Sequence, residues 1–181
     1  MKKTSLIDLA LPTFAGALMI TSVAAQEAVQ VQTPTTLSET YDSWTVQCAN
    51  RSEGEQTRRV CQMSQELLQQ ESRQRVLLFA ISKEGENAAK ATVIAPFGLM
   101  LSEGLRIEIN ETELVRGAYR TCLPAGCVVE FDLPEAAIDQ LGAAEAATVF
   151  MTANTGQPVT TDISMKGFSA AYQRLVALSA G

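Results

Sequence analysis

The sequence predicts a mainly β protein, an antiparallel β-sandwich of immunoglobulin-like architecture with two short helices and two disulfides. Three observations support this prediction. Short segments of alternating apolar and polar residues recur along the chain, turn residues separate them, and only two stretches have helical spacing. The chain has 181 residues, of which 46% are hydrophobic, and this is enough for one domain with its own core.

Composition argues against several classes of function. The formal net charge is −6, from 14 Lys+Arg against 20 Asp+Glu, so a nucleic-acid partner is not expected. The chain contains no histidine, which removes the Ser-His-Asp and Cys-His arrangements of nucleophilic catalysis and the usual imidazole ligands of zinc. We therefore expect no cofactor, no metal and no enzyme activity.

Residues 1–25 have the order of a secretory signal peptide. Two lysines follow Met1, residues 9–23 are mostly apolar, and small residues precede a cleavage site between Ala25 and Gln26. A membrane anchor is the alternative, but the apolar stretch is shorter than the roughly 20 residues that span a bilayer. We expect an exported protein in the periplasm or at the outer membrane or cell surface, with no transmembrane span in its mature form.

The mature chain divides into a leader and one domain. Residues 26–40 are polar, rich in Thr and Gln, and lack sustained apolar periodicity. This composition predicts a flexible leader rather than a strand over residues 29–31. Strand patterns begin at Tyr41, and the predicted domain covers residues 41–178.

Strands are predicted in order along this domain. Trp44, Val46 and Cys48 alternate with polar residues and give one face for a core. Residues 76–81 are continuously apolar, and a polar turn separates them from residues 91–94, which favours a hairpin over a buried helix. The clearest alternation covers residues 105–109. Further strands are predicted over residues 60–63, 128–133, 147–152 and 159–165.

Two short helices interrupt this pattern. Pro134 can open the first helix, because its missing N–H would be unpaired in a first turn anyway, and Gly142 can close it. Apolar residues with helical spacing predict the second helix over residues 169–178, with one face packed on the sheets.

Four cysteines allow three pairings, and we expect the local one, Cys48–Cys61 and Cys122–Cys127. Both members of the first pair flank predicted strands, and the second pair brackets a Leu-Pro-Ala-Gly turn. Neither pair has the Cys-x-x-Cys spacing of thiol oxidoreductases, and only one pair is close enough in sequence for a four-cysteine zinc site. A structural role is therefore favoured.

Two charged clusters are predicted to be solvated. Glu108, Glu111 and Glu113 surround a strand end, where acid–base work is conceivable but an exposed strand edge is the better interpretation. Arg51, Arg58 and Arg59 form a small basic patch in the first disulfide loop. This patch could contact an anionic partner, but a solvated loop is favoured.

The segment Phe97-Gly98-Leu99-Met100-Leu101 is a conspicuously apolar turn. If Phe97, Leu99 and Leu101 were partly exposed, they would form the natural surface for a partner. Burial between the two sheets is the favoured alternative.

Five motifs stand along the domain: Tyr-Asp-Ser-Trp-Thr-Val-Gln-Cys at 41–48, Val-Cys-Gln-Met-Ser-Gln-Glu at 60–66, Ala-Pro-Phe-Gly-Leu-Met-Leu at 95–101 with Gly104-Leu105, Tyr-Arg-Thr-Cys-Leu-Pro-Ala-Gly-Cys at 119–127, and Lys-Gly-Phe-Ser-Ala-Ala at 166–171. Together they resemble the invasion-associated locus B family of exported α-proteobacterial proteins. The resemblance implies a compact β-sandwich with two disulfides, located in the periplasm or at the cell surface. It also implies an association with host-cell invasion in pathogenic members, and it supplies no catalytic residues.

We therefore expect an exported, non-enzymatic protein that acts through contacts with an unidentified protein partner at the cell envelope. Two alternatives stay open. One is an envelope enzyme that uses Cys122 and Cys127 for thiol redox chemistry, and the other is a small-ligand binder with an apolar pocket behind residues 97–101.

Overall fold

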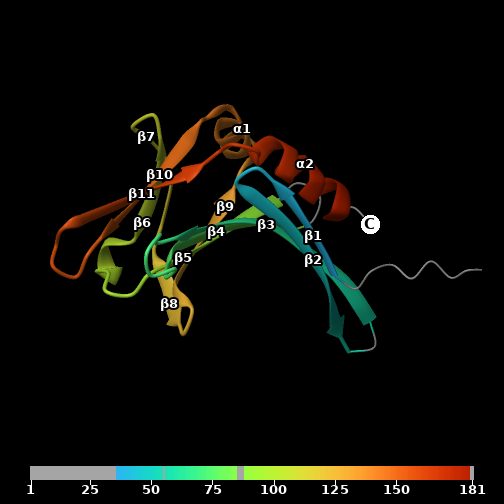
Figure 1. Ribbon diagram of the computed structural model, residues 1–181, viewed down its shortest axis with the longest axis horizontal. Coiled ribbons are helices and arrows are strands. Elements are labelled where there is room, and N and C mark those ends of the chain that lie inside the picture. The colour runs from blue at the N-terminus through green and yellow to red at the C-terminus, as the bar shows by residue number, and fades with distance from the viewer. Residues whose placement is uncertain (1–35, 55, 85–87, 180–181) are drawn as a thin grey trace, which may run out of the picture. The chain divides into compact units, whose positions relative to one another are not determined.

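The computed structural model describes residues 36–179 except 55 and 85–87, and Figure 1 shows the arrangement. The expected signal peptide and its cleavage site lie outside the described residues. In chain order the elements are β1 (Thr36–Tyr41), β2 (Trp44–Glu53), β3 (Gln56–Leu68), β4 (Arg75–Glu84), β5 (Ala88–Ala95), the 3-10 helix η1 (Leu101–Glu103), β6 (Leu105–Ile109), β7 (Thr112–Gly117), β8 (Tyr119–Leu123), β9 (Gly126–Leu133), α1 (Glu135–Ala143), β10 (Ala146–Thr152), β11 (Pro158–Ser164) and α2 (Phe168–Ser179).

The strands form two antiparallel sheets, which confirms the predicted fold class. One sheet has seven strands in the order β1-β2-β3-β4-β5-β9-β8, and the other has four in the order β11-β10-β6-β7. The predicted hairpin around residue 85 is the β4–β5 pair, in which Leu78 lies opposite Ile94. Both helices lie close to their expected positions, although α1 continues past Gly142 to Ala143.

Three strands were not predicted, and all of them have weak alternation signals. The strand β1 pairs with β2 from Thr36 onward, so the last five residues of the expected leader belong to the sheet, and this boundary is corrected. The strands β7 and β8 lie at sheet edges, and neither contains a buried residue, so neither carries a row of buried apolar side chains. Edge strands of this kind differ little from loops in composition.

One core fills the space between the sheets and α2. Alternate residues of β2, β3 and β4 point into it, among them Trp44, Met63 and Phe79, each with at most 1% of its surface exposed. The helix α2 packs across β1–β4, and the four-stranded sheet contributes the inward-facing row of Leu105, Ile107 and Ile109 (Figure 1). The seven-stranded sheet is therefore covered partly by strands and partly by a helix.

The two sheets are tied together at Ser164, the last residue of β11. The indole Nε1 of Trp44 donates a hydrogen bond to the Ser164 carbonyl at 2.9 Å. The buried amide of Gln65 donates to the same carbonyl at 2.8 Å and accepts from the Ser164 N–H at 3.0 Å. Trp44 also makes edge contacts with Phe79 and Phe168, so one indole contacts both the sheet and α2.

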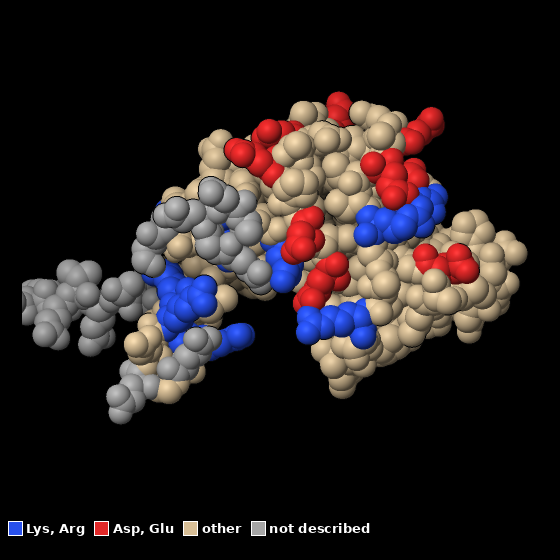
Figure 2. All heavy atoms as spheres, turned by 180° about the vertical axis from the view of Figure 1, so that it is seen from behind, with Lys and Arg blue, Asp and Glu red and all other residues tan. Residues whose placement is uncertain are grey.

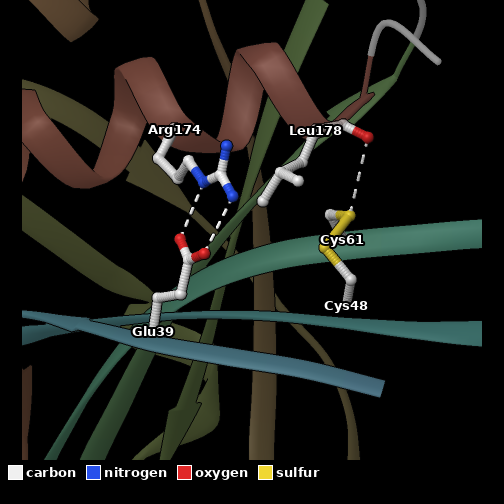
Figure 3. Close-up of a disulfide and its surroundings, with 5 residues drawn as sticks. All are labelled: Glu39, Cys48, Cys61, Arg174 and Leu178. Atoms are coloured by element: carbon white, nitrogen blue, oxygen red, sulfur yellow. Dashed lines mark hydrogen bonds and ion pairs between the residues drawn. A yellow bond between two sulfur atoms is a disulfide. The ribbon is translucent and has the colours of Figure 1, made fainter. Parts of the chain in front are cut away.

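The start of α2 requires a glycine. Gly167 has φ +84°, and a Cβ atom there would lie 2.2 Å from the carbonyl oxygen of Tyr41, which is far inside contact distance. The chain therefore passes close against β1 before the helix begins. Further along α2, Arg174 holds β1 through two hydrogen bonds of 2.7 and 2.8 Å to the Glu39 carboxylate, and this contact lowers the pKa of Glu39 (Figure 3).

The structure contains two disulfides, which join Cys48 to Cys61 and Cys122 to Cys127. In each pair the cysteines stand directly opposite each other on neighbouring strands. The first disulfide is buried under the end of α2, where Cys61 Sγ lies 3.8 Å from the Leu178 carbonyl oxygen (Figure 3). The second closes the β8–β9 hairpin, and its Cys122 side is exposed.

Replacing Gln65 by leucine tests the tie at Ser164. We expect Gln65→Leu to lower the free energy of unfolding by about 2 kcal/mol, because the half-buried Ser164 N–H loses its acceptor and the Ser164 carbonyl loses one donor. The matched control is Gln62→Leu on the exposed face of the same strand, which should change stability by less than about 0.5 kcal/mol. Urea unfolding followed by tryptophan fluorescence measures the stability of both variants. Equal losses would show that the Gln65 amide does not stabilise the contact between the two sheets.

Removing each disulfide separately tests its share of the stability. We expect Cys48→Ala/Cys61→Ala to lower the free energy of unfolding by about 3 kcal/mol and Cys122→Ala/Cys127→Ala by about 2 kcal/mol, because the first bond closes a longer loop. Denaturant unfolding without reductant measures both variants. The reverse order of losses would contradict the loop-closure argument.

Candidate interaction surface

Large apolar side chains gather at one end of the molecule. Five large hydrophobic residues are exposed in the described part of the chain, and three of them belong to neighbouring loops: Phe97 at 61%, Leu101 at 45% and Leu123 at 52%. Leu99 lies between the first two and is half-buried against the core. We call Phe97, Leu99, Leu101 and Leu123 the apolar end.

The loop that carries Phe97 is held by backbone hydrogen bonds to the β10–β11 turn. The Asn154 N–H donates to the Gly98 carbonyl, and the Met100 N–H donates to the Thr152 carbonyl, each at 2.8 Å. Leu99 forms an isolated bridge with Ala153 between these two bonds. The loop connects β5 of one sheet to β6 of the other, so both sheets fix its position.

The hairpin that carries Leu123 lies against the end of β5. Cys127 of β9 pairs with Ala95, the last residue of β5, and with Cys122 of β8. Gly126 makes this approach possible, since a Cβ there would lie 2.4 Å from the Ala95 carbonyl oxygen. Because Phe97 follows Ala95 by two residues, Phe97 and Leu123 belong to the same end of the seven-stranded sheet.

The segments that form this end carry few charges, although η1 ends at the exposed Glu103. Residues 96–102, 121–127 and 153–159 contain no Asp, Glu, Lys or Arg, although 19% of the whole chain is charged. Exposed large apolar side chains on segments with few charges are typical of a surface that another molecule covers. The expected burial of Phe97 and Leu101 between the sheets is therefore wrong, because the loop's backbone, rather than its longest side chains, packs against the second sheet.

Leu123 was missed by the sequence reasoning, which treated residues 122–127 only as a disulfide turn. The sequence does indicate its exposure, since a leucine between a cysteine and a proline beside a tight turn has few neighbours to bury it. At the other end of β8, Tyr119 packs its ring against the core, and its buried hydroxyl has no hydrogen-bond partner among the described residues. This burial raises the pKa of Tyr119 to about 12.

Of the three glutamates singled out from the sequence, the structure places Glu108 and Glu113 directly opposite each other on β6 and β7. Glu108 is paired with Arg106 and Glu113 with Arg116, and the hydrogen bond from Arg116 lowers the pKa of Glu113. Cys122 and Cys127 are bonded across a β-hairpin rather than placed at a helix start. Over the described ranges no group of three Asp, Glu, Cys or His residues could hold a metal ion.

Two surface cavities of about 490 and 500 Å³ lie away from the apolar end. Residues of β1–β3 line the first, and α1 and α2 line most of the second. Neither lining includes Phe97, Leu99 or Leu101, so these cavities do not form the pocket expected behind that loop. Among the described helices, none has the length and apolar character needed to cross a membrane.

The two packed antiparallel sheets, their helical cover and their cross-strand disulfides define a disulfide-linked β-sandwich domain. Residues 44–176 match the family model described as Invasion associated locus B protein, and the chain belongs to this family, as its motifs predicted. An invasion protein B homologue of Brucella abortus (strain 2308) is 31% identical over 167 residues, covering 90% of this chain and 94% of the relative.

Two further relatives come from Bartonella. Invasion protein B of Bartonella bacilliformis is 29% identical over 146 residues, covering 78% of this chain and 76% of the relative. The crystal structure of invasion associated protein B from Bartonella henselae has a TM-score of 0.71 at 26% sequence identity, and the match covers 80% of this chain and 97% of that one. The fold is therefore shared with a solved member of the family.

Proposed function

We propose that this protein is exported, has no enzymatic activity, and acts at the cell envelope by binding another protein through the apolar end. The single observation that carries the proposal is the exposure of Phe97, Leu101 and Leu123 on segments that contain few charged residues. Burying one such side chain in a partner contributes about 1.5–3 kcal/mol. Three of them at the centre of an interface match the pattern of a small set of residues that dominates binding.

The backbone that carries the apolar end supports this role. Its hydrogen bonds to Thr152 and Asn154 anchor one loop, and the Cys122–Cys127 disulfide closes the hairpin that carries Leu123. Binding by a preformed surface avoids the entropy cost of ordering a flexible loop, so more of the apolar contact energy contributes to affinity.

Export is supported by two features of the chain. Residues 1–25 have the pattern of a cleaved signal peptide, and two disulfides persist best in an oxidising compartment outside the cytoplasm. The names of the relatives connect those proteins with invasion. For this chain, a role in contact with a host cell is part of the proposal, with the periplasm or the bacterial surface as the compartment.

Site-specific photo-crosslinking in living cells tests the interaction surface. A photoreactive amino acid placed at Phe97 or Leu123 should give a discrete crosslinked product with another protein, because both side chains would be covered in the complex. The matched control is the same substitution at Val176, which is 39% exposed on α2 and lies away from the apolar end. Products of equal yield at all three positions, or none at Phe97 and Leu123, would contradict the proposal.

The N-terminus of the protein recovered from the periplasm or the medium tests export. We expect it to begin at Gln26, because small residues stand at the positions that the signal peptidase inspects. Mass spectrometry of the intact protein under non-reducing conditions gives the terminus and the oxidation of the four cysteines together. A chain that keeps residues 1–25 and stays in the cytoplasm would refute this part of the proposal.

A further inference from the structure

The unpaired positive charges of this acidic protein are concentrated on one hairpin. Among the described residues, ion pairs with carboxylates are formed by the side chains of Arg75, Arg106, Arg116, Arg120, Lys166 and Arg174. Four arginines make no such pair, and three of these, Arg51, Arg58 and Arg59, stand together on β2 and β3. Figure 2 shows basic side chains gathered on the projecting hairpin at the left of that view.

Arg51 and Arg58 are exposed within the ring closed by the first disulfide, as expected, but they belong to paired strands rather than to a loop. Arg51 lies in β2 and Arg58 in β3, directly opposite each other in the ladder. Opposed residues of an antiparallel pair share a face, and two like charges placed in this way repel each other. An anion bound between the two guanidinium groups would remove this repulsion and accept hydrogen bonds from both.

A groove of about 490 Å³ lies along β1–β3, and its lining includes Arg51, Gln47 and Gln62. Arg58 stands opposite Arg51 in the ladder, beside the groove rather than in its lining. In successive rows along the strands, Arg51 stands beside Arg58, Ala49 lies between Thr36 and Val60, and Gln47 lies between Ser38 and Gln62. The polar residues of these rows are exposed and offer hydroxyl and amide groups. The strand rise places the glutamine row about 13 Å from the arginine row.

These dimensions favour one kind of ligand. A single small anion could reach the arginine row but not the glutamine row, whereas an oligosaccharide chain can contact both. Sugar hydroxyls are matched by the amide and hydroxyl side chains, and a sulfate or carboxylate group by the paired guanidinium groups. The hairpin offers only Val60 as an exposed large hydrophobic residue, which argues against insertion into a lipid surface.

We propose that the outer face of β1–β3 binds an acidic polysaccharide, with Arg51 and Arg58 holding a sulfate or carboxylate group and Gln47 and Gln62 contacting neighbouring sugars. This site lies on the β1–β3 side of the seven-stranded sheet, while the apolar end belongs to its β5-β9-β8 side. In Figure 1 the hairpin projects at the lower right and η1 lies at the left. The polysaccharide site is therefore separate from the proposed protein-binding surface.

Titration calorimetry of the purified protein with a sulfated heparin oligosaccharide and an oligogalacturonate tests the proposal. At about 50 mM salt we expect binding of at least one of them, weakened about tenfold or more in Arg51→Gln/Arg58→Gln. The control, Arg59→Gln/Arg73→Gln, removes the same amount of charge from outside the groove face and should weaken binding less than about threefold. Gln62→Ala, which changes no charge, should weaken it about threefold.

The remaining outcomes overturn the proposal. If the two double variants lost equal affinity, binding would depend only on net charge. If Gln62→Ala bound as tightly as the unchanged protein, the groove would not be part of the site. The protein is also tested with phosphatidylglycerol vesicles and with polyglutamate. If it bound either of them as tightly as the oligosaccharides, with the same dependence on Arg51 and Arg58, the proposed ligand class would be wrong. If the protein binds neither oligosaccharide while thermal unfolding shows that it is folded, the site is refuted. Crosslinking at Phe97 should be unchanged in Arg51→Gln/Arg58→Gln.

Discussion

The hydrogen bonds at Ser164 are the constraint on which the rest of the structure depends. Ser164 ends β11 in the small sheet, and its backbone is held by Trp44 and Gln65 from the large one. A buried amide can be tolerated there because both of its polar atoms are paired, whereas an unpaired one would cost about 1–3 kcal/mol. The junction also sets where the chain turns at Gly167 and begins α2, so it positions the helical cover as well as the second sheet.

The sequence predicted well the elements that have one buried face. Leu105, Ile107 and Ile109 alternate with polar residues because their strand packs on the core from one side only, and the pattern records this directly. The edge strands β7 and β8 have no such face, and β1 shows only a partly buried one. Their pairing is decided by the backbone and by contacts with distant residues, such as that of Glu39 with Arg174, which local patterns do not show.

The sequence singled out three residues of the candidate surface, but their exposure was not predicted. Hydrophobicity marks Phe97, Leu99 and Leu101 as unusual for a turn, yet it cannot say which neighbours the fold supplies. In the structure the backbone on either side of Leu99 is anchored to Thr152 and Asn154, and this directs Phe97 outward. The strand pairing of the arginine hairpin was missed because residues 50–59 are all polar or glycine and show no apolar alternation.

The position of the second disulfide connects stability with function. Cys122 and Cys127 lie on β8 and β9, toward the opposite edge of the large sheet from the β2 and β3 residues that hold Ser164. They close the hairpin in which Leu123 is the last residue of β8. A bond that only stabilised the core would be as effective deeper in the sheet, where the first disulfide already lies under α2. At the sheet edge it instead limits fraying of β8, which has a single neighbour strand. Its local effect is to keep Leu123 in register beside the end of β5, so the second disulfide stabilises the apolar end in particular.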